Sequence, residues 1–229
     1  MIEDYLRCPA NYKRKHIDGI REKTSSSAMS FGTAMHTALK AHFDGEDPYM
    51  SFNMYWNSLK DEHLEYDRFS WEDLGAMSVD TFLPNFLRLH AKHIEPVRME
   101  ETLTMPILGE HTLQGTYDIV ANVDGVLTMI DYKTSAKEYP KSKIYRNPQL
   151  YIYAALYKHT YGVMPQQIMY KVFIKTEKRI QSLKINLTEE SLQHSMNNVT
   201  DIVEDIVNRK KFYCNYQSCF CPTPRECFK

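Results

Sequence analysis

The sequence lacks an excess of charge of either sign: its 229 residues carry 28 lysines and arginines against 29 aspartates and glutamates, a net charge of −1. A nearly neutral protein has no overall positive field that would indicate nucleic-acid binding, although a local basic groove remains compatible with it. No apolar run is long enough to span a bilayer, and the first residues, MIEDYLRCPANYKRKH, contain no signal-peptide core. We therefore expect a cytoplasmic protein without membrane association.

Cysteine is absent between positions 8 and 214. Cys8 stands alone, whereas Cys214, Cys219, Cys221 and Cys227 crowd into the last sixteen residues. In a cytoplasmic protein such residues are thiols or metal ligands rather than a disulfide framework. Four thiolates suit a tetrahedral Zn²⁺ or an iron–sulfur cluster. Either metal would fasten a tail that has too few apolar residues to pack by itself.

Internal repeats are also missing, and the hydrophobic period changes from helical to strand spacing after about residue 93. Helical spacing covers residues 3–16, 30–43 and most of 48–93, and strand patterns follow at 97–105, 111–123 and 126–133. Asp124–Gly125 is a strong hairpin turn signal. A helix over 147–162, capped by Asn147, two strands over 166–176 and 179–187, and an amphipathic helix over 188–210 complete the order.

This order of elements predicts an α/β (α+β) fold with a mixed central β-sheet flanked by helices. The length fits a single domain over residues 1–229. We expect a mainly helical region over 1–95, a core over 96–187, a C-terminal helix over 188–211 and a cysteine-rich tail over 212–229.

Two aspartates and a lysine gather on one predicted hairpin. Asp131 and Lys133 are two residues apart, so they share a face of their strand, and Asp118 belongs to the partner strand. Two neighbouring carboxylates repel each other unless a cation lies between them, and oxygen ligands suit Mg²⁺ or Mn²⁺. A nearby lysine can offset charge while a phosphodiester is cleaved. Taken alone, the triplet also fits an ordinary surface ion pair.

Two helices add polar residues to this set. His36 follows Gly32, a small residue that would allow the helix start to approach another backbone closely. Gln149 and Tyr153 are one helical turn apart and share a face. A lone helical histidine or a polar pair on an aromatic helix also fits simple packing, so the combination carries the argument.

The ordered motifs YLRCP, GTAMH, GTYDIV, IDYKT and QLYIY resemble the RecB-type branch of the PD-(D/E)xK nuclease superfamily. That branch includes the nuclease domains of RecB and AddB, the CRISPR-adaptation exonucleases and related phage exonucleases. The resemblance extends from about Tyr5 to Cys227. It implies a restriction-endonuclease-like fold and a metal-dependent deoxyribonuclease activity, with exonuclease action favoured.

The resemblance also implies roles for individual residues. His36, Asp118 and Asp131 would bind Mg²⁺ or Mn²⁺, Lys133 would be the catalytic lysine, and Gln149 and Tyr153 would position the substrate or support the site. A further acid on the first strand is sometimes involved. Glu101 alternates in phase with Val97, Met99 and Leu103 and is the candidate, whereas Glu100 is expected to be solvated.

In the iron–sulfur members of this branch, one early cysteine and three late ones hold a four-iron four-sulfur cluster. Cys8, Cys221 and Cys227 match that arrangement, and Cys219 is the favoured fourth ligand, with Cys214 as the alternative. The expected C-x2-C spacing is replaced here by Cys219-x-Cys221, so the fourth ligand stays open. A structural Zn²⁺ is the alternative to the cluster.

Phosphate contacts are expected from local basic runs, over residues 12–16 and over 137–146. The second run supplies the candidates Lys137, Lys141, Lys143, Tyr145 and Arg146. Solvated loops are the simpler explanation of both runs.

The sequence thus predicts an exonuclease acting on single-stranded DNA or DNA ends in recombination, repair or phage DNA processing, in a prokaryotic or phage-infected cell, with a recombination or replication protein as a candidate partner. The alternatives are a non-catalytic DNA-end-binding subunit, a structure-selective endonuclease and a zinc-tailed regulatory protein.

Overall fold

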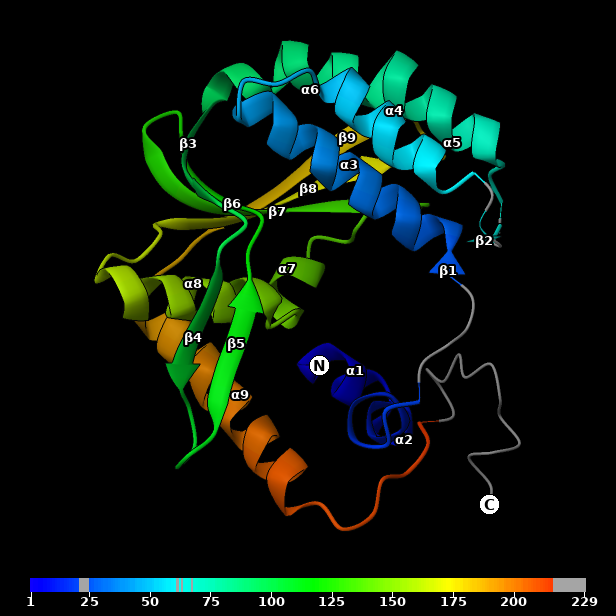
Figure 1. Cartoon of the computed structure of the whole chain (residues 1–229). Helices are drawn as coiled ribbons and strands as arrows, with labels where there is room; N and C mark the ends of the chain where they lie inside the picture. The colour runs from blue at the N-terminus through cyan, green and yellow to red at the C-terminus, as the bar shows by residue number, and fades with distance from the viewer. Residues whose placement is uncertain (21–24, 61, 63, 67, 216–229) are drawn as a thin grey trace.

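The computed structural model describes residues 1–20, 25–60, 62, 64–66 and 68–215. Its central layer is a five-stranded sheet, with one group of helices on one face and a second group on the other (Figure 1). None of the described helices is long and apolar enough to cross a lipid bilayer.

Among the helical elements that precede the sheet, the first is interrupted where one continuous helix was predicted. They are α1 (Ile2–Arg7), α2 (Pro9–Tyr12), the π-helical turn η1 (Lys13–Ile17), α3 (Ser27–Phe43), α4 (Pro48–Ser58), α5 (Trp71–Met77), the π-helical turn η2 (Ser78–Phe82), α6 (Leu83–Leu89) and the 3-10 turn η3 (Ala91–His93). The helix predicted over 3–16 is interrupted at Cys8, whose backbone is extended. Pro9 explains the break, because a proline disfavours helical geometry in the residue before it.

Capping residues determine where two functional helices begin. The side chain of Ser26 accepts a hydrogen bond from the backbone N–H of Ala28, so α3 starts three residues before the predicted Ser30. Asn147 Oδ1 accepts from the N–H of Gln149 at 2.9 Å, but α8 begins at Gln149 with Pro148 as its N-cap, one residue later than predicted. The remaining helices are α7 (Lys143–Arg146), α8 (Gln149–Tyr161) and α9 (Glu189–Asn208).

The central sheet is mixed, which confirms the predicted fold class. Its order is β3 (Ile94–Met99), β6 (Ile119–Val123), β7 (Val126–Ser135), β8 (Gln167–Ile174) and β9 (Arg179–Asn186). Only the β7–β8 pair is parallel; the other neighbours are antiparallel. A separate antiparallel hairpin contains β4 (Thr102–Pro106) and β5 (Thr112–Thr116), and a short parallel pair joins β1 (Ser25–Ser26) to β2 (Leu64–Glu65).

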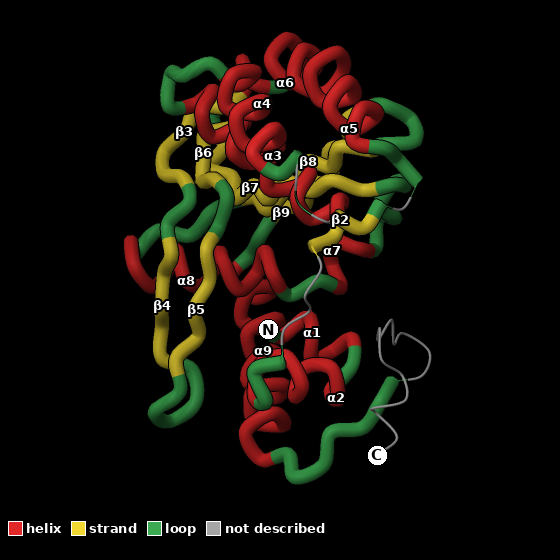
Figure 2. The backbone as a smooth tube through the Cα atoms, turned by 45° about the vertical axis from the view of Figure 1, so that its right-hand side comes forward, coloured by secondary structure: helices red, strands yellow, loops and turns green. Residues whose placement is uncertain are grey.

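Two strands predicted as continuous are each broken. The strand predicted over 97–105 divides at Glu100, whose φ of 49° lies in the left-handed region, and the strand predicted over 111–123 divides at Tyr117 and Asp118. The two breaks face each other, since the N–H of Glu100 donates to the carbonyl oxygen of Asp118 at 2.9 Å. Beyond them the β4–β5 hairpin leaves the sheet and extends over α8 (Figures 1 and 2). Asp118 therefore lies in a bend and not within a strand.

The two faces of the sheet build two hydrophobic cores. Along β7, Ile130 and Tyr132 belong to the core beneath α3, whereas Met129 belongs to the core against α8. Because side chains alternate along a strand, Asp131 and Lys133 point toward the α8 side. β7 continues to Ser135 in register with β8, so these residues lie within a strand and not at its end.

Candidate active site

The candidate site lies beside the part of β7 that extends past the first residue of β6. β6 begins at Ile119, opposite Ile130, so the next residues of β7 have β8 on one side and no strand on the other. Side chains satisfy the backbone there: the N–H of Tyr132 donates to Asp118 Oδ2 at 2.6 Å, and His36 Nε2 lies 2.9 Å from the carbonyl oxygen of Tyr132. The notch in the sheet thus brings α3 and the bend at Asp118 to the same two peptide groups of β7.

Asp131 and Lys133 form an ion pair within this notch, with Lys133 Nζ 2.7 Å from Asp131 Oδ2. Asp131 is 1% exposed. Burial, together with the nearby charge of Asp118, raises the pKa of Asp131 to about 7, against the opposing effect of Lys133. Burial disfavours the Lys133 ammonium, but the carboxylate of Asp131 outweighs it and the pKa of Lys133 is raised. Lys133 is therefore a positive charge at neutral pH.

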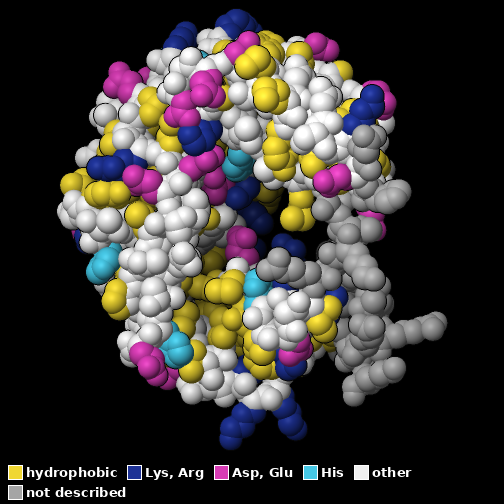
Figure 3. Space-filling view, in the orientation of Figure 1, with side chains coloured by type: hydrophobic (Ala, Val, Ile, Leu, Met, Phe, Trp, Pro, Cys, Tyr) yellow, Lys and Arg dark blue, Asp and Glu magenta, His cyan; other side chains and the backbone are white. Residues whose placement is uncertain are grey.

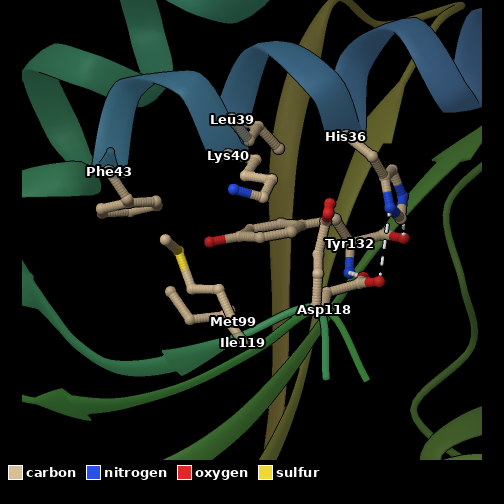
Figure 4. A pocket seen from close by; sticks show the side chains of 9 residues that line it. His36, Leu39, Lys40, Phe43, Met99, Asp118, Ile119 and Tyr132 are labelled. Atoms are coloured by element: carbon tan, nitrogen blue, oxygen red, sulfur yellow. Dashed lines mark hydrogen bonds and ion pairs between the residues drawn. The ribbon is translucent and has the colours of Figure 1, made fainter. Parts of the chain in front are cut away.

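His36 reaches the same site from α3. Its Nδ1 lies 3.3 Å from Asp118 Oδ1, and Figure 4 shows the ring turned toward that carboxylate. Burial lowers the pKa of His36, but the hydrogen bond and charge of Asp118 raise it by more. Gly32 does not provide the close backbone approach expected of it: the nearest atom to an added Cβ is the side-chain Oγ1 of Thr134 at 3.5 Å, an ordinary contact.

Gln149 and Tyr153 lie one turn apart on α8, on the side of the sheet that Asp131 and Lys133 face. Gln149 Nε2 donates to the Tyr153 hydroxyl at 2.9 Å. Burial, and then the charge of Asp131, raise the pKa of Tyr153 to about 12, so the phenol stays protonated at neutral pH. A Cβ on Gly115 of β5 would lie 2.8 Å from the Tyr153 ring, so this glycine lets the hairpin approach the tyrosine.

The structure does not bring Glu101 together with the other acids. Its carboxylate accepts hydrogen bonds from the hydroxyls of Tyr117 and Tyr161 and pairs with Arg98. The bend at Glu100 has shifted the alternation on which the sequence argument depended. Glu100 instead lines the pocket beside His36 and Asp118, although its side chain is largely exposed as predicted.

The two ends of the described chain lie next to each other, so Cys8 and the segment of Cys214 are neighbours. The N–H of Ala10 donates to the carbonyl oxygen of Tyr213 at 3.1 Å, and Asn215 Nδ2 donates to the carbonyl oxygen of Arg7 at 3.1 Å. Cys8 is buried and Cys214 half-buried. Cys219, Cys221 and Cys227 lie outside the described residues.

The candidate phosphate-contact residues all lie on the surface near α7. The ammonium of Lys143 forms a cation–π contact with Tyr139, 5.4 Å from the centre of the ring. The exposed side chains are those of Lys137, Lys141, Lys143, Tyr145 and Arg146.

The donor chemistry of the notch fits a hard divalent cation. Asp118 and Asp131 supply carboxylates, His36 an imidazole and Tyr132 a main-chain carbonyl, and such oxygen-rich sets suit Mg²⁺ and Mn²⁺. Within the described part of the chain no three histidine, cysteine or acidic side chains form a ready-made metal cage. Lys133 would have to leave the carboxylate of Asp131 when a cation binds there, and His36 could hold the cation only through an unprotonated ring nitrogen.

Sequence reasoning missed Tyr132 and Glu100. Tyr132 acts through its backbone, and its position inside the Asp131–Lys133 triplet was the available signal. Glu100 reaches the pocket through a left-handed conformation that glutamate seldom adopts, and no sequence pattern indicated it.

Comparison with known proteins agrees with this architecture. The sequence matches the family described as the PD-(D/E)XK nuclease superfamily over residues 1–227. Among solved structures, a candidate exonuclease from Eubacterium rectale aligns with a TM-score of 0.63 at 14% sequence identity, covering 98% of this chain and 86% of its own. A second structure, SSO0001, covers 97% of both chains at 16% identity, but its TM-score of 0.38 is too low to bear on the fold. No curated protein matches significantly.

The family match extends over almost every residue, and the likeness to a solved structure supports the fold independently. The chain therefore belongs to the PD-(D/E)XK nuclease superfamily, whose members are metal-dependent nucleases.

Proposed function

We propose that the protein is a Mg²⁺- or Mn²⁺-dependent deoxyribonuclease of the RecB type that acts as an exonuclease on single-stranded DNA or DNA ends, in the cytoplasm of a prokaryotic or phage-infected cell. One observation carries the proposal. Asp118, directly before the first residue of β6, lies near Asp131, and Lys133 Nζ lies 2.7 Å from Asp131 Oδ2 on the same strand.

In this proposal Asp118, Asp131, His36 and the carbonyl oxygen of Tyr132 would hold the divalent ion. When bound, such an ion polarises the phosphate and lowers the pKa of a bound water. The buried position of Asp131 keeps solvent away from the ligands and strengthens their charges. The short bond from the Tyr132 N–H fixes the orientation of Asp118.

Lys133 stabilises the negative charge that develops on the phosphate oxygens in the transition state. It cannot act as the general base at neutral pH, because Asp131 keeps it protonated. Tyr153 and Gln149 support the substrate from α8, where the hydrogen bond between them fixes both side chains.

The cysteines at the two ends of the chain are proposed to hold a four-iron four-sulfur cluster, with a structural Zn²⁺ as the alternative. The ligands would be Cys8, Cys221 and Cys227 with either Cys219 or Cys214. The backbone bond from Ala10 to Tyr213 supports this arrangement, because it places the start of the tail beside the helix that follows Cys8. Visible absorbance with iron in the purified protein would support the cluster, and zinc without colour would support the alternative.

The test of the proposed activity is degradation of end-labelled linear DNA and of circular DNA in Mg²⁺ or Mn²⁺. Wild type is compared with Asp131→Asn and with Asp124→Asn, a matched change at the exposed turn of the same hairpin. We expect wild type and Asp124→Asn to degrade linear DNA and Asp131→Asn to be inactive. Cutting of circles would favour an endonuclease. Binding of DNA without cleavage of any substrate by metal-loaded protein would favour a non-catalytic partner subunit and contradict the proposal.

A further inference from the structure

A second cavity adjoins the candidate active site on the α8 side of the sheet. It has a volume of about 390 Å³ and lies between α1, α8, α9 and the β4–β5 hairpin. This size falls within the range of small-ligand sites in proteins. Its apolar wall comes from four separate segments, through Ile2, Leu113, Ile152, Val203, Ile206 and Val207.

The cavity shares two residues of α8 with the candidate active site. Gln149 and Tyr153 line it, and Tyr153 is close enough to Asp131 and Lys133 for their charges to act on its hydroxyl. Figure 3 shows the molecule hollowed between its upper and lower parts, with charged side chains around the hollow and hydrophobic ones on its lower wall. A strand whose phosphate lies at Lys133 therefore has an apolar space beside it.

Polar groups at this boundary are not fully satisfied by the protein. Gln149 Oε1 is buried and has no hydrogen-bond partner among the described residues. Such an acceptor is costly unless a ligand supplies the missing donor. The Tyr153 hydroxyl accepts from Gln149, so its own hydrogen is directed elsewhere and can be donated. One free acceptor and one free donor beside an apolar space match the polar edge and flat faces of a nucleobase.

We propose that this space, which we call the base cavity, holds one unstacked nucleobase of the strand being cut. The proposal rests on the proposed nuclease function and deepens it by naming an unpaired nucleotide next to the scissile phosphate as the substrate. A base within a duplex cannot enter, because its faces are covered by stacking and its edge is paired. The base cavity thus selects single strands and frayed ends.

The test measures binding, so that it does not depend on cleavage. Labelled single strands that each lack the base at one successive position are bound to full-length Lys133→Ala protein, in which the DNA stays intact. We expect the dissociation constant to rise about tenfold or more when the missing base is the one that occupies the base cavity, and to change little at other positions.

Variants on α9 locate the effect in the cavity. Val207 is 45% exposed and lines the cavity, so Val207→Trp narrows it without disturbing the core. This change should weaken binding of the intact strand by a similar factor and remove the effect of the missing base. Asn208→Trp is the control, because Asn208 is exposed on the same helix and does not line the cavity.

The outcomes separate this inference from the proposed function. Binding that is equal for all positions of the missing base, or unaffected by Val207→Trp, would overturn the base cavity even if wild type degrades DNA. A single sensitive position in a protein that cleaves no DNA would sustain the base cavity and sink the nuclease proposal.

Discussion

At the scale of single residues, Asp131 and Lys133 determine each other's charge. Burial of Asp131 favours its neutral form, and the ammonium 2.7 Å away opposes that tendency. The carboxylate in turn keeps Lys133 protonated although its side chain is only 27% exposed. Lys133 therefore stays protonated, and its ammonium is the group that can stabilise negative charge on the phosphate.

Lys133→Met tests this charge. The variant keeps the length of the side chain and removes the ammonium, so we expect kcat to fall about 10²- to 10³-fold, as for loss of one transition-state donor. Lys92→Met is the control, because Lys92 is exposed. Single-turnover cleavage measures the effect. A variant that loses affinity for DNA but keeps its rate at saturation would place Lys133 in ground-state binding and not in catalysis.

A second buried lysine lies away from the site. Lys171 on β8 is 6% exposed, with its Nζ 2.9 Å from Ser182 Oγ and 3.1 Å from His90 Nδ1. Burial lowers the pKa of Lys171 to about 8, and burial together with Lys171 lowers the pKa of His90 to about 4. No carboxylate is paired with this ammonium among the described salt bridges, so the folded state favours the neutral amine.

Stability should therefore rise with pH between about 8 and 10. In this window the folded protein has released the proton of Lys171 while the unfolded chain still binds it, so the free energy of unfolding increases, by about 2 kcal/mol between pH 7 and 9.5. Lys171→Met should be more stable at pH 7 and lose this rise, whereas Lys92→Met should keep it. Denaturant unfolding at pH 7 and pH 9.5 measures the free energy of unfolding. An equal rise of this free energy with pH in wild type and Lys171→Met would contradict the prediction.

The residues of the site divide into those that alternation predicts and those that it does not. Asp131 and Lys133 share a face because side chains alternate along β7, and the hairpin register, which pairs Ile119 with Ile130, brings the bend at Asp118 close to Asp131. The role of Tyr132 depends on where β6 begins. Because no described strand pairs with this edge of β7 at Tyr132, its backbone N–H and carbonyl oxygen are available to Asp118 and His36. Any amino acid other than proline has the same backbone groups, so only the position between Asp131 and Lys133, and not the tyrosine side chain, could indicate this role.

At the scale of elements, the β4–β5 hairpin is seated on α8 through a glycine. An added Cβ at Gly115 would lie 2.8 Å from one carbon of the Tyr153 ring and 3.1 Å from Leu156 Cδ1, closer than side chains pack. Gly115→Ala should push the hairpin off the helix, destabilise the protein by about 1–3 kcal/mol and slow cleavage through the displaced Tyr153.

Gly32→Ala on α3 should instead stabilise the protein. Its added methyl meets only Thr134 Oγ1 at 3.5 Å, so the gain in helix propensity should dominate and raise stability by about 0.5–1 kcal/mol. Thermal unfolding of both variants distinguishes the cases. Equal changes in the unfolding temperature of Gly115→Ala and Gly32→Ala would show that the contact of Gly115 with Tyr153 does not determine the change in stability.

The elements themselves were largely predictable, and their interruptions were not. Asp124 and Gly125 form the expected hairpin turn with φ of 49° and 83°. The breaks at Glu100 and Asp118 were not predicted, because strand-like sequence lies on both sides of each break, in the sheet and in the hairpin. Tertiary packing of the hairpin on α8 overrides the local preference for one straight strand.

At the scale of the whole molecule, the sheet and the two ends of the chain are held by different contacts. The sheet is enclosed by its two hydrophobic cores. The N-terminal helix is held at α9 and the tail: the Tyr5 hydroxyl donates to Asp205, and the guanidinium of Arg209 lies 5.3 Å from the Tyr5 ring and 4.9 Å from the Tyr213 ring. A metal site at Cys8 would reinforce only this second set of contacts.

Cys8→Ala should therefore separate the two parts energetically. With the proposed cluster or zinc ion lost, backbone amides of α1, α2 and residues 209–215 should exchange with solvent faster, because the remaining contacts there are few and partly exposed. Amides of β6, β7 and β8 should keep their protection, since both cores are intact. Hydrogen exchange of wild type and variant, with Ser58→Ala as a distant control, measures this pattern. Loss of protection throughout the sheet would instead mean that the fold depends on the metal at its ends.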